Sequence, residues 1–288
     1  TTTATDGTHT LTATARDATG NTTTSGSVSV TVNNSVVTPP PTSGGPVAMY
    51  SFSEGSGSTL GDTSGNNITG SLLNGVTWTA SGHANSALSF DGVNDSVSLG
   101  NPSALNPTSA VTLEAWIKPN TFGASQFIVT KDNGSATQYY IRIQGNTGIR
   151  FAIGAGGTAT TYTPSVSLTA GTWYHIAGVY NGTDMRVYVN GSLIGTPQAK
   201  TGLMSAIGFP AIIGLNNTGV LPFNGAIDDV RIYNRALSAS EIVTDMNTPV
   251  TPVSGGGTPS DITPPSVSLS SPSAGSVSGT VSVSATAS

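Results

Sequence analysis

The chain has 288 residues, and only 8% of them are charged, against about 25% in a typical soluble domain. Its 36 Gly and 17 Pro fit short strands joined by many turns and exclude a coiled coil or a helix bundle. Lys and Arg number 9 against 14 Asp and Glu, and the net charge of −5 excludes a basic nucleic-acid binder. The absence of Cys excludes disulfides, thiolate metal sites and cysteine nucleophiles.

The amino-terminal region, residues 1–33, alternates polar and apolar residues. The alternation predicts a strand, a turn near residues 16–21, and a second strand in which Val28, Val30 and Val32 share one face. Residues 34–45 follow, with three consecutive prolines, and are predicted to form an extended linker.

The central region, residues 46–247, contains all three tryptophans and is predicted to be one domain. No apolar run in the chain approaches the ~18 residues of a membrane span, so we expect no membrane insertion. Segments with two-residue periodicity predict strands at residues 111–118, 126–131, 139–144, 148–153, 172–180 and 223–233. So many strands in about 200 residues favour an all-β fold, a jelly roll of two packed antiparallel sheets.

Two local signals are sharper than the strand pattern. Asn190-Gly191 lies between two alternating runs, which is the strongest short signal for a β-hairpin. Ser238 followed by Glu241 three residues later forms a capping box and predicts a helix that ends near Met246.

The carboxyl-terminal region repeats the pattern of the amino-terminal one. Residues 248–264 are predicted to be a second linker, and residues 265–288 alternate again as strands. Residues 6–32 resemble the closing hairpin of the immunoglobulin-like repeats of large bacterial surface proteins, and residues 263–288 resemble the opening of such a repeat. A complete repeat needs about 100 residues, so we expect the chain to run from inside one repeat to inside another.

The central domain resembles a known family along its whole length. The segments that carry the resemblance are YSFSEGSGSTLGDTSGNNITGSL, ALSFDGVNDSVSLG, VTLEAWIKP, GTWYHIAGVYNGTDMRVYVNGSLIG and FNGAIDDVRIYNRALSASEI, in that order. They resemble the laminin-G-like branch of the concanavalin A-like lectin/glucanase superfamily. The resemblance implies a jelly roll, but it leaves the function open, because the superfamily holds lectins, adhesion modules, spacers and glycosidases.

Catalysis is not predicted. Glycosidases of this superfamily use paired carboxylates at alternate strand positions, but Glu occurs here only at 54, 114 and 241. Glu114 is interpreted as a solvated, outward strand residue, and His175 as a packed or half-exposed strand residue rather than a base. No nucleophile spacing or phosphate-binding loop is found, so no catalytic residue is assigned.

A structural calcium ion is one interpretation of the last strand. Asp228 and Asp229 are adjacent there, so their carboxylates are expected on opposite faces, with one needing a partner. Relatives of this fold often hold calcium against the aspartate at the position of Asp228, and the resemblance implies Glu54 and Gly92 as companions. The alternative, left open, is that Arg231 or a backbone amide satisfies Asp228.

Two turns rich in oxygen ligands provide further calcium candidates. Asp62 begins one of them and Asp91 the other. Calcium prefers about six to eight oxygen ligands, which such turns can supply. The alternative is that both aspartates bond to their own backbone as turn-forming residues.

Aromatic side chains are the candidates for sugar binding, because sugars stack on exposed aromatic faces. We single out Trp116, Tyr139 and Tyr162, with Tyr140 and Tyr180 as further candidates. The alternative is that these rings belong to the core, as aromatic residues of a β-sandwich more often do.

The sequence as a whole therefore favours a non-catalytic binding or adhesion module of a large multidomain extracellular or cell-surface protein. The expected ligand is a glycan or another extracellular matrix or cell-surface molecule. Two alternatives remain open: a structural spacer in a surface stalk, and an accessory domain of a glycoside hydrolase or other secreted enzyme whose catalytic domain lies elsewhere.

Overall fold

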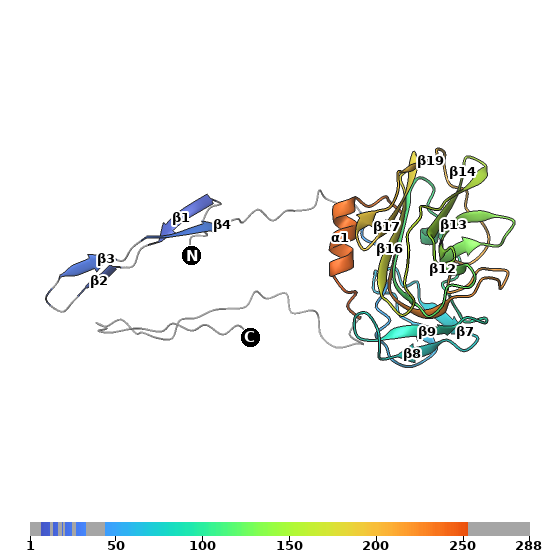
Figure 1. Ribbon diagram of the computed structural model, residues 1–288, viewed down its shortest axis with the longest axis horizontal. Helices are drawn as coiled ribbons and strands as arrows, with labels where there is room; N and C mark the ends of the chain where they lie inside the picture. Colours follow the sequence, from blue (N-terminus) through green and yellow to red (C-terminus); the bar gives the residue numbers. More distant parts are fainter. Residues whose placement is uncertain are drawn as a thin grey trace. The chain divides into compact units, whose positions relative to one another are not determined.

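The computed structural model describes residues 44–252 throughout and, before them, residues 7–11, 14–16, 19, 21–24 and 27–32 (Figure 1). The chain divides into two compact units, one containing the amino-terminal strands and the other spanning Ser43–Gly255. We describe each unit separately.

The amino-terminal strands form the predicted strand–turn–strand arrangement. β1 (Gly7–Leu11) pairs with β4 (Val28–Val32), and β2 (Thr14–Arg16) pairs with β3 (Thr22–Thr24), both antiparallel. The predicted opening strands at 265–288 lie outside the described residues. Membership of either end in an immunoglobulin-like repeat therefore stays a prediction.

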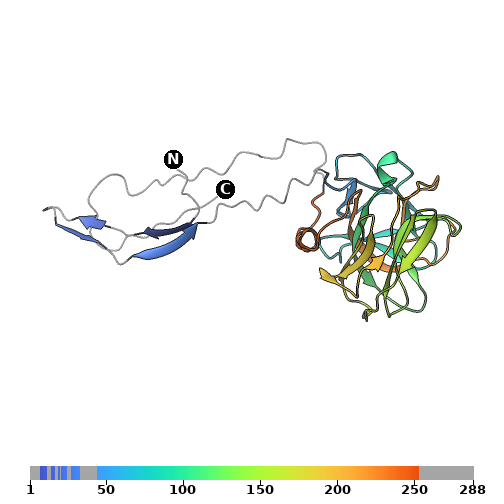
Figure 2. The same ribbon diagram turned by 90° about the horizontal axis from the view of Figure 1, so that it is seen from above.

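The larger unit is the predicted all-β sandwich of two antiparallel sheets (Figures 1 and 2). The eight-stranded sheet has the order β15 (Thr158–Tyr162), β14 (Ile149–Ala155), β13 (Thr137–Ile143), β12 (Gln126–Asp132), β20 (Ile212–Ile213), β10 (Ser96–Ser98), β7 (Gly70–Leu73), β6 (Thr59–Leu60). The nine-stranded sheet has the order β18 (Ser192–Leu193), β17 (Asp184–Val189), β16 (Tyr174–Tyr180), β11 (Val111–Pro119), β21 (Asn224–Tyr233), β9 (Ala87–Asp91), β8 (Thr77–Thr79). Two short strands extend it: β19 (Gln198–Ala199) pairs with β17, and β5 (Ala48–Tyr50) pairs with β21.

The main core lies between the inner faces of the two sheets. Leu113, Ala115 and Ile117 alternate along β11 and are fully buried, as the two-residue period predicts. The sheets approach each other closely at Gly178 on β16, where an added Cβ would lie 2.5 Å from the Phe151 ring on β14. Only glycine fits there without moving that ring.

The turn and helix signals are both confirmed. Asn190 and Gly191 have φ of 49° and 74°, and they connect β17 to β18 as a tight hairpin. The helix α1 (Ala239–Asn247) begins at Ser238, whose side chain and that of Glu241 form the predicted capping box. A short 3₁₀ helix spans Ser103–Leu105. No helix in the described part of the chain is both long and apolar enough to cross a bilayer.

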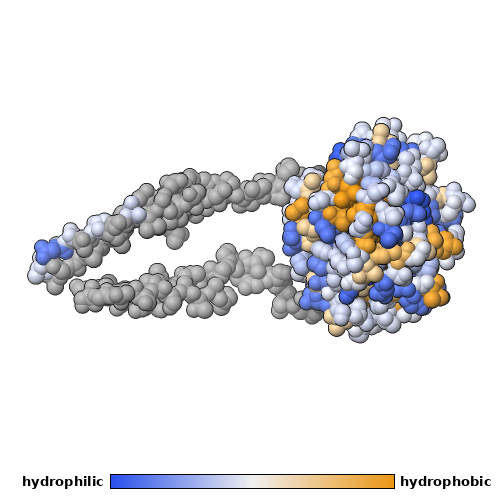
Figure 3. Space-filling view, in the orientation of Figure 1, coloured by the Kyte–Doolittle hydropathy of each residue, from blue (hydrophilic) through white to orange (hydrophobic). Residues whose placement is uncertain are grey.

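The helix α1 covers part of the outer face of the nine-stranded sheet (Figures 1 and 2). A second, smaller hydrophobic cluster lies beneath it, formed by Ala177, Val179, Tyr188, Tyr233, Leu237 and Ile242. On the surface shown in Figure 3, an orange area lies around α1 and β17. Val243 on α1 and Leu193 on β18 are exposed apolar residues. The nine-stranded sheet is therefore a middle layer over part of its area, with α1 outside it.

Candidate functional site

Three aromatic side chains gather on the outer face of the nine-stranded sheet. Trp116 projects outward from β11 and is partly exposed, and the exposed His83 ring lies flat on it, with centroids 3.4 Å apart and an interplanar angle of 12°. Trp173, just before β16, meets His83 edge-on at 6.0 Å. We call Trp116, Trp173 and His83 the aromatic cluster.

Asp228 holds the loop that carries His83. Its Oδ2 accepts the backbone N–H groups of His83 and Ala84, at 2.9 and 3.0 Å, and its Oδ1 accepts the N–H of Asp229 at 2.8 Å. Asp228 is fully buried on β21, directly opposite Trp116 on β11. One carboxylate therefore fixes the loop over the indole ring that its strand partner presents.

A β-bulge changes the expected geometry of the adjacent aspartates. Between Glu114 and Trp116 on β11, the partner strand β21 contains one extra residue, and Asp229 has a φ of 47°. The alternation of faces is therefore interrupted, and Asp229 accepts the N–H of Val250, which follows α1, at 3.1 Å. Both carboxylates thus bond to segments outside the nine-stranded sheet, and the expectation of opposite faces was wrong.

Glu114 is buried rather than solvated, which corrects our interpretation of this residue. It is 0% exposed, because α1 covers this part of the sheet. Burial, together with nearby Asp245 on α1, raises its pKa well above the usual value. His175 is also 0% exposed, as a packed strand residue, and burial lowers its pKa to about 3. The two side chains are 4.0 Å apart, and these pKa shifts make them a neutral pair rather than an ion pair.

The predicted calcium ligands are not brought together at one point. Asp91 and Gly92 lie beside Asn224, four residues before Asp228 on β21 and so roughly 13 Å away along the strand. The Oε1 atom of Glu54 accepts the N–H of Gly61 at 2.6 Å. In the described part of the chain, no group of three His, Cys, Asp or Glu side chains could hold an ion.

Asp62 and Asp228 already have several protein donors. Asp62 accepts backbone N–H groups from Met49, Ser64 and Ile68 at 2.9–3.0 Å, as well as the Ser64 hydroxyl at 2.8 Å. Asp228 accepts the three N–H groups described above. These donors already occupy the carboxyl oxygens of both side chains, so the predicted set does not fit a calcium site. Calcium binding stays an untested prediction.

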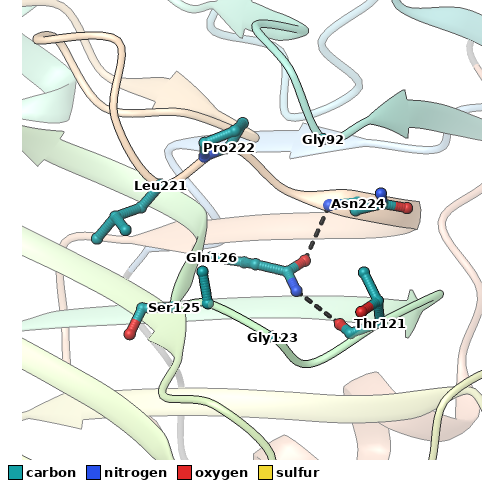
Figure 4. A pocket seen from close by; sticks show the side chains of 9 residues that line it. Gly92, Thr121, Gly123, Ser125, Gln126, Leu221, Pro222 and Asn224 are labelled. Atoms are coloured by element: carbon teal, nitrogen blue, oxygen red, sulfur yellow. Dashed lines mark hydrogen bonds between the residues drawn. The ribbon is translucent and has the colours of Figure 1, made fainter.

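A cavity of about 250 Å³ lies near the ends of β9, β12 and β21 (Figure 4). Gln126 crosses it: its Oε1 accepts the N–H of Asn224 at 2.8 Å, and its Nε2 donates to the carbonyl of Thr121. Gly92 has a φ of +81°, and a Cβ there would lie 2.7 Å from the Asn224 amide. Because the Gln126 amide bonds to the backbones of Asn224 and Thr121, and the Asn224 side chain bonds to Asn120 and to the Asp91 carbonyl, the cavity offers few free polar groups to a ligand.

The other predicted aromatic ligands are placed differently from Trp116. Tyr139 is 0% exposed, and its hydroxyl donates to the carbonyl of Leu105 at 3.1 Å. A ring buried in the core offers no face to a sugar. Tyr162 is partly exposed, but its hydroxyl donates to the carbonyls of Ile194 and Thr196, and it packs against the core. Only Trp116 of the three belongs to the aromatic cluster.

Sequence reasoning did not select Trp173 or His83 as binding residues. His83 lies in a loop with no regular pattern, and only the bonds to Asp228 place it on Trp116. Trp173 falls inside the strand predicted at 172–180, but β16 begins one residue later, at Tyr174, so the two-residue period does not show which way its ring points. The only signal in the sequence that could have pointed to them is the small number of tryptophans, three in all. In the structure, two of these tryptophans contact His83.

Comparison with known proteins supports the fold at several levels. Domain 4 of an extracellular GH43 arabinanase from Geobacillus stearothermophilus, solved with arabinotriose, is 20% identical, with a TM-score of 0.56 over 70% of this chain and 98% of that domain. The botulinum neurotoxin serotype G binding domain is 15% identical, with a TM-score of 0.58 over 70% of this chain and 50% of that one. At these identities the likeness shows the fold.

Sequence comparison gives one curated relative and the family. Adhesion G-protein coupled receptor V1 of Danio rerio is 30% identical over 142 residues, which cover 46% of this chain and only 2% of the receptor. Residues 91–243, more than half of the chain, match the laminin-G family described as the concanavalin A-like lectin/glucanases superfamily. The chain therefore belongs to the laminin-G-like family of the concanavalin A-like lectin/glucanase superfamily.

Proposed function

We propose that the sandwich domain is a non-catalytic module of an extracellular protein and binds a neutral carbohydrate at the aromatic cluster. The observation that carries this proposal is the partly exposed pair Trp116 and Trp173 on one sheet face. Sugar rings pack their C–H faces on such rings, and their hydroxyls bond to surrounding polar groups. Lys118 lies on the same face of β11, two residues from Trp116, and is partly exposed.

His83 has a defined part in this proposal. It lies parallel to Trp116 at the distance of direct stacking, so it occupies the position that a sugar ring would take. The backbone of its loop is fixed by Asp228, but its side chain is exposed and can rotate. Ligand binding then displaces the His83 ring, and a variant without the ring binds more tightly because nothing has to move.

Other observations support sugar binding rather than catalysis. Glu114, the carboxylate nearest in sequence to Trp116 on β11, lies beneath α1 where no substrate can contact it. One similar solved domain was determined with arabinotriose, and another belongs to botulinum neurotoxin type C, whose cell entry depends upon interaction with two ganglioside molecules. These ligands belong to those proteins, and they support carbohydrate as the ligand class here.

Affinity electrophoresis tests the proposal, with neutral arabinan, xylan and β-glucan in separate gels. At least one polysaccharide should retard the wild-type chain, Trp116→Ala should bind it about tenfold more weakly, and His83→Ala should bind it more tightly. Trp78→Ala is the matched control. The indole N–H of Trp78 donates to the Gly57 carbonyl at 2.9 Å, and this ring is not part of the aromatic cluster. Equal retardation of Trp116→Ala and Trp78→Ala would disprove the assignment of the site.

A second candidate role is that of an accessory domain in a secreted enzyme. The similarity to Domain 4 of an arabinanase, which this chain matches over 98% of that domain, favours it specifically. The two roles share the same binding chemistry. They differ in whether the complete gene also encodes a catalytic domain, so its sequence distinguishes them.

A further inference from the structure

Two arginines face each other on the outer face of the eight-stranded sheet. Arg142 on β13 and Arg150 on β14 are direct cross-strand partners, and both are partly exposed. Like charges in this position repel and destabilise a sheet, so the pairing has a cost in the free chain. Neither arginine takes part in the ion pairs found among the described residues.

The guanidinium groups are held in place without a carboxylate. Arg142 lies over the rings of Phe127 and Tyr140, at 5.3 and 5.5 Å, and donates to Gln144 Oε1 at 3.1 Å. Its buried Nε has no partner. Arg150 donates from Nε to the Thr163 hydroxyl at 2.9 Å. Both forks are therefore oriented, and both retain unused N–H donors.

The carboxylate that acts electrostatically on Arg142 is Asp132, and it is bonded elsewhere. Its Oδ1 accepts the N–H of Gly134 at 2.9 Å, and its Oδ2 accepts the Thr137 hydroxyl. It is 5% exposed, so it reduces the positive field without forming an ion pair with either arginine. In a chain with a net charge of −5, this pair is a local concentration of positive charge.

We propose that Arg142 and Arg150 form a second binding site, which takes the carboxylate or sulfate groups of an acidic saccharide. Paired guanidinium forks suit bidentate contact with such groups. The surroundings favour a saccharide over an acidic peptide with apolar anchors. Gln144, Thr161 and Thr163 offer amide and hydroxyl groups, and the exposed large apolar residues of the described chain include none on β13, β14 or β15. The site lies on the other sheet from the aromatic cluster and does not depend on it.

Titration calorimetry at low ionic strength tests this site with polygalacturonate, dextran sulfate and neutral dextran. The chain should bind one or both polyanions but not dextran, and added salt should weaken the binding. Polygalacturonate alone would identify a carboxylate ligand, and dextran sulfate alone a sulfate ligand. Arg150→Gln and the double variant Arg142→Gln/Arg150→Gln should weaken binding, the double variant by about tenfold.

The control variant is Arg186→Gln, which removes an arginine of the other sheet that is paired with Asp184 at 2.8 Å. It should bind the polyanions within about twofold of wild type, because the charge it removes lies outside the site. Equal loss in Arg150→Gln and Arg186→Gln would overturn the proposal, as would poly-glutamate binding as tight as that of the best polysaccharide. Trp116→Ala should leave polyanion binding intact, so failure of the aromatic site is distinguishable from failure of this one.

Discussion

The two outer faces of the sandwich differ in whether their charged side chains are buried or exposed. On the nine-stranded sheet, acidic side chains such as Glu114 and Asp228 are fully buried beneath α1 and neighbouring segments. On the eight-stranded sheet, Arg142 and Arg150 remain partly exposed side by side. The chain has few charged residues, and α1 and neighbouring segments bury several of them on the nine-stranded sheet. Burial therefore determines which of these charges a ligand can contact. We call the outer face of the nine-stranded sheet, which α1 overlies, the covered face, and the outer face of the eight-stranded sheet the open face. The buried acids of the covered face hold neighbouring segments in place, and its aromatic rings lie at the margin. The open face presents positive charge.

The largest expected effect is the loss of Asp228. Asp228→Ala removes the acceptor of three backbone N–H groups and should reduce the free energy of unfolding by about 3–5 kcal/mol. Arg150→Gln, on the open face, is the matched control and should change it by less than about 0.5 kcal/mol. Urea unfolding measures both. Similar changes in the free energy of unfolding for the two variants would contradict a structural role that is specific to the covered face.

The covered face should also make stability depend on pH. Burial raises the pKa of Asp228 to about 7 and that of Asp229 to about 6, from 3.8. The folded state then holds more protons than the unfolded state between about pH 4 and 7, so stability falls as pH rises through that range. Glu114, with its raised pKa, adds to the fall. His175 opposes it up to pH 6.5, because its pKa is lowered to about 3.

We expect a net loss of at least about 2 kcal/mol between pH 5 and pH 8, measured by urea unfolding at each pH, and Glu114 should make it larger. Asp228→Asn cannot ionise at this position and should flatten the profile, whereas Arg150→Gln should leave it unchanged. A stability that rises steadily from pH 5 to pH 8 in the wild type would show that these acids are ionised in the folded state.

A smaller effect on stability is expected from weakening the helix α1, which covers the nine-stranded sheet. Ser238→Ala removes the N-cap of α1 and should reduce the free energy of unfolding by about 1 kcal/mol. Hydrogen exchange at α1 should increase in this variant, while exchange on β13 and β14 should not change. Increased exchange on both sheets would show that α1 stabilises the whole sandwich rather than one face.

The open face should tolerate loss of its charge. Arg150→Gln removes the repulsion with Arg142 and should leave the chain equally stable or more stable by up to about 0.5 kcal/mol. Thermal unfolding at low and high salt measures this, because salt screens the same repulsion in the wild type. A marked loss of stability would indicate that Arg150 has a structural role, most directly through Thr163.

The smallest expected effect is that of calcium. Since Asp62 and Asp228 are bonded to several protein donors, the melting temperature should be the same in EGTA and in millimolar calcium. A bound ion at 100 times its dissociation constant would instead raise it by roughly 5–10 °C. Such a rise, absent in Asp228→Asn, would restore the predicted calcium site.

Local patterns in the sequence predicted the sandwich well. The two-residue period predicted the longer strands of both sheets but not short ones such as β6, β10 and β20. Asn190-Gly191 predicted the hairpin, and Ser238 with Glu241 predicted the helix start. These signals are local, so one sequence is enough to recognise them. The family resemblance supplied the order of the segments, which the match over residues 91–243 supports.

The site was harder to predict because it depends on contacts between distant segments. An outward residue such as Glu114 is solvated only if nothing covers the sheet, and no pattern in β11 shows that α1 lies above it. The extra residue of the bulge at Asp229 likewise leaves no mark on the alternation of polar and apolar residues. Tyr139 and Trp116 are both aromatic strand residues, and only the three-dimensional packing separates the buried ring from the accessible one.

A crossed binding measurement on Trp116→Ala and Arg142→Gln/Arg150→Gln separates the two proposed sites most sharply. Calorimetry would use the neutral polysaccharide that the wild type binds best, and polygalacturonate or dextran sulfate as the polyanion. We expect Trp116→Ala to lose only the neutral ligand and the double arginine variant to lose only the polyanion, each by about tenfold. Loss of both ligands in one variant, or of neither ligand in either variant, would contradict the assignment of one site to each face.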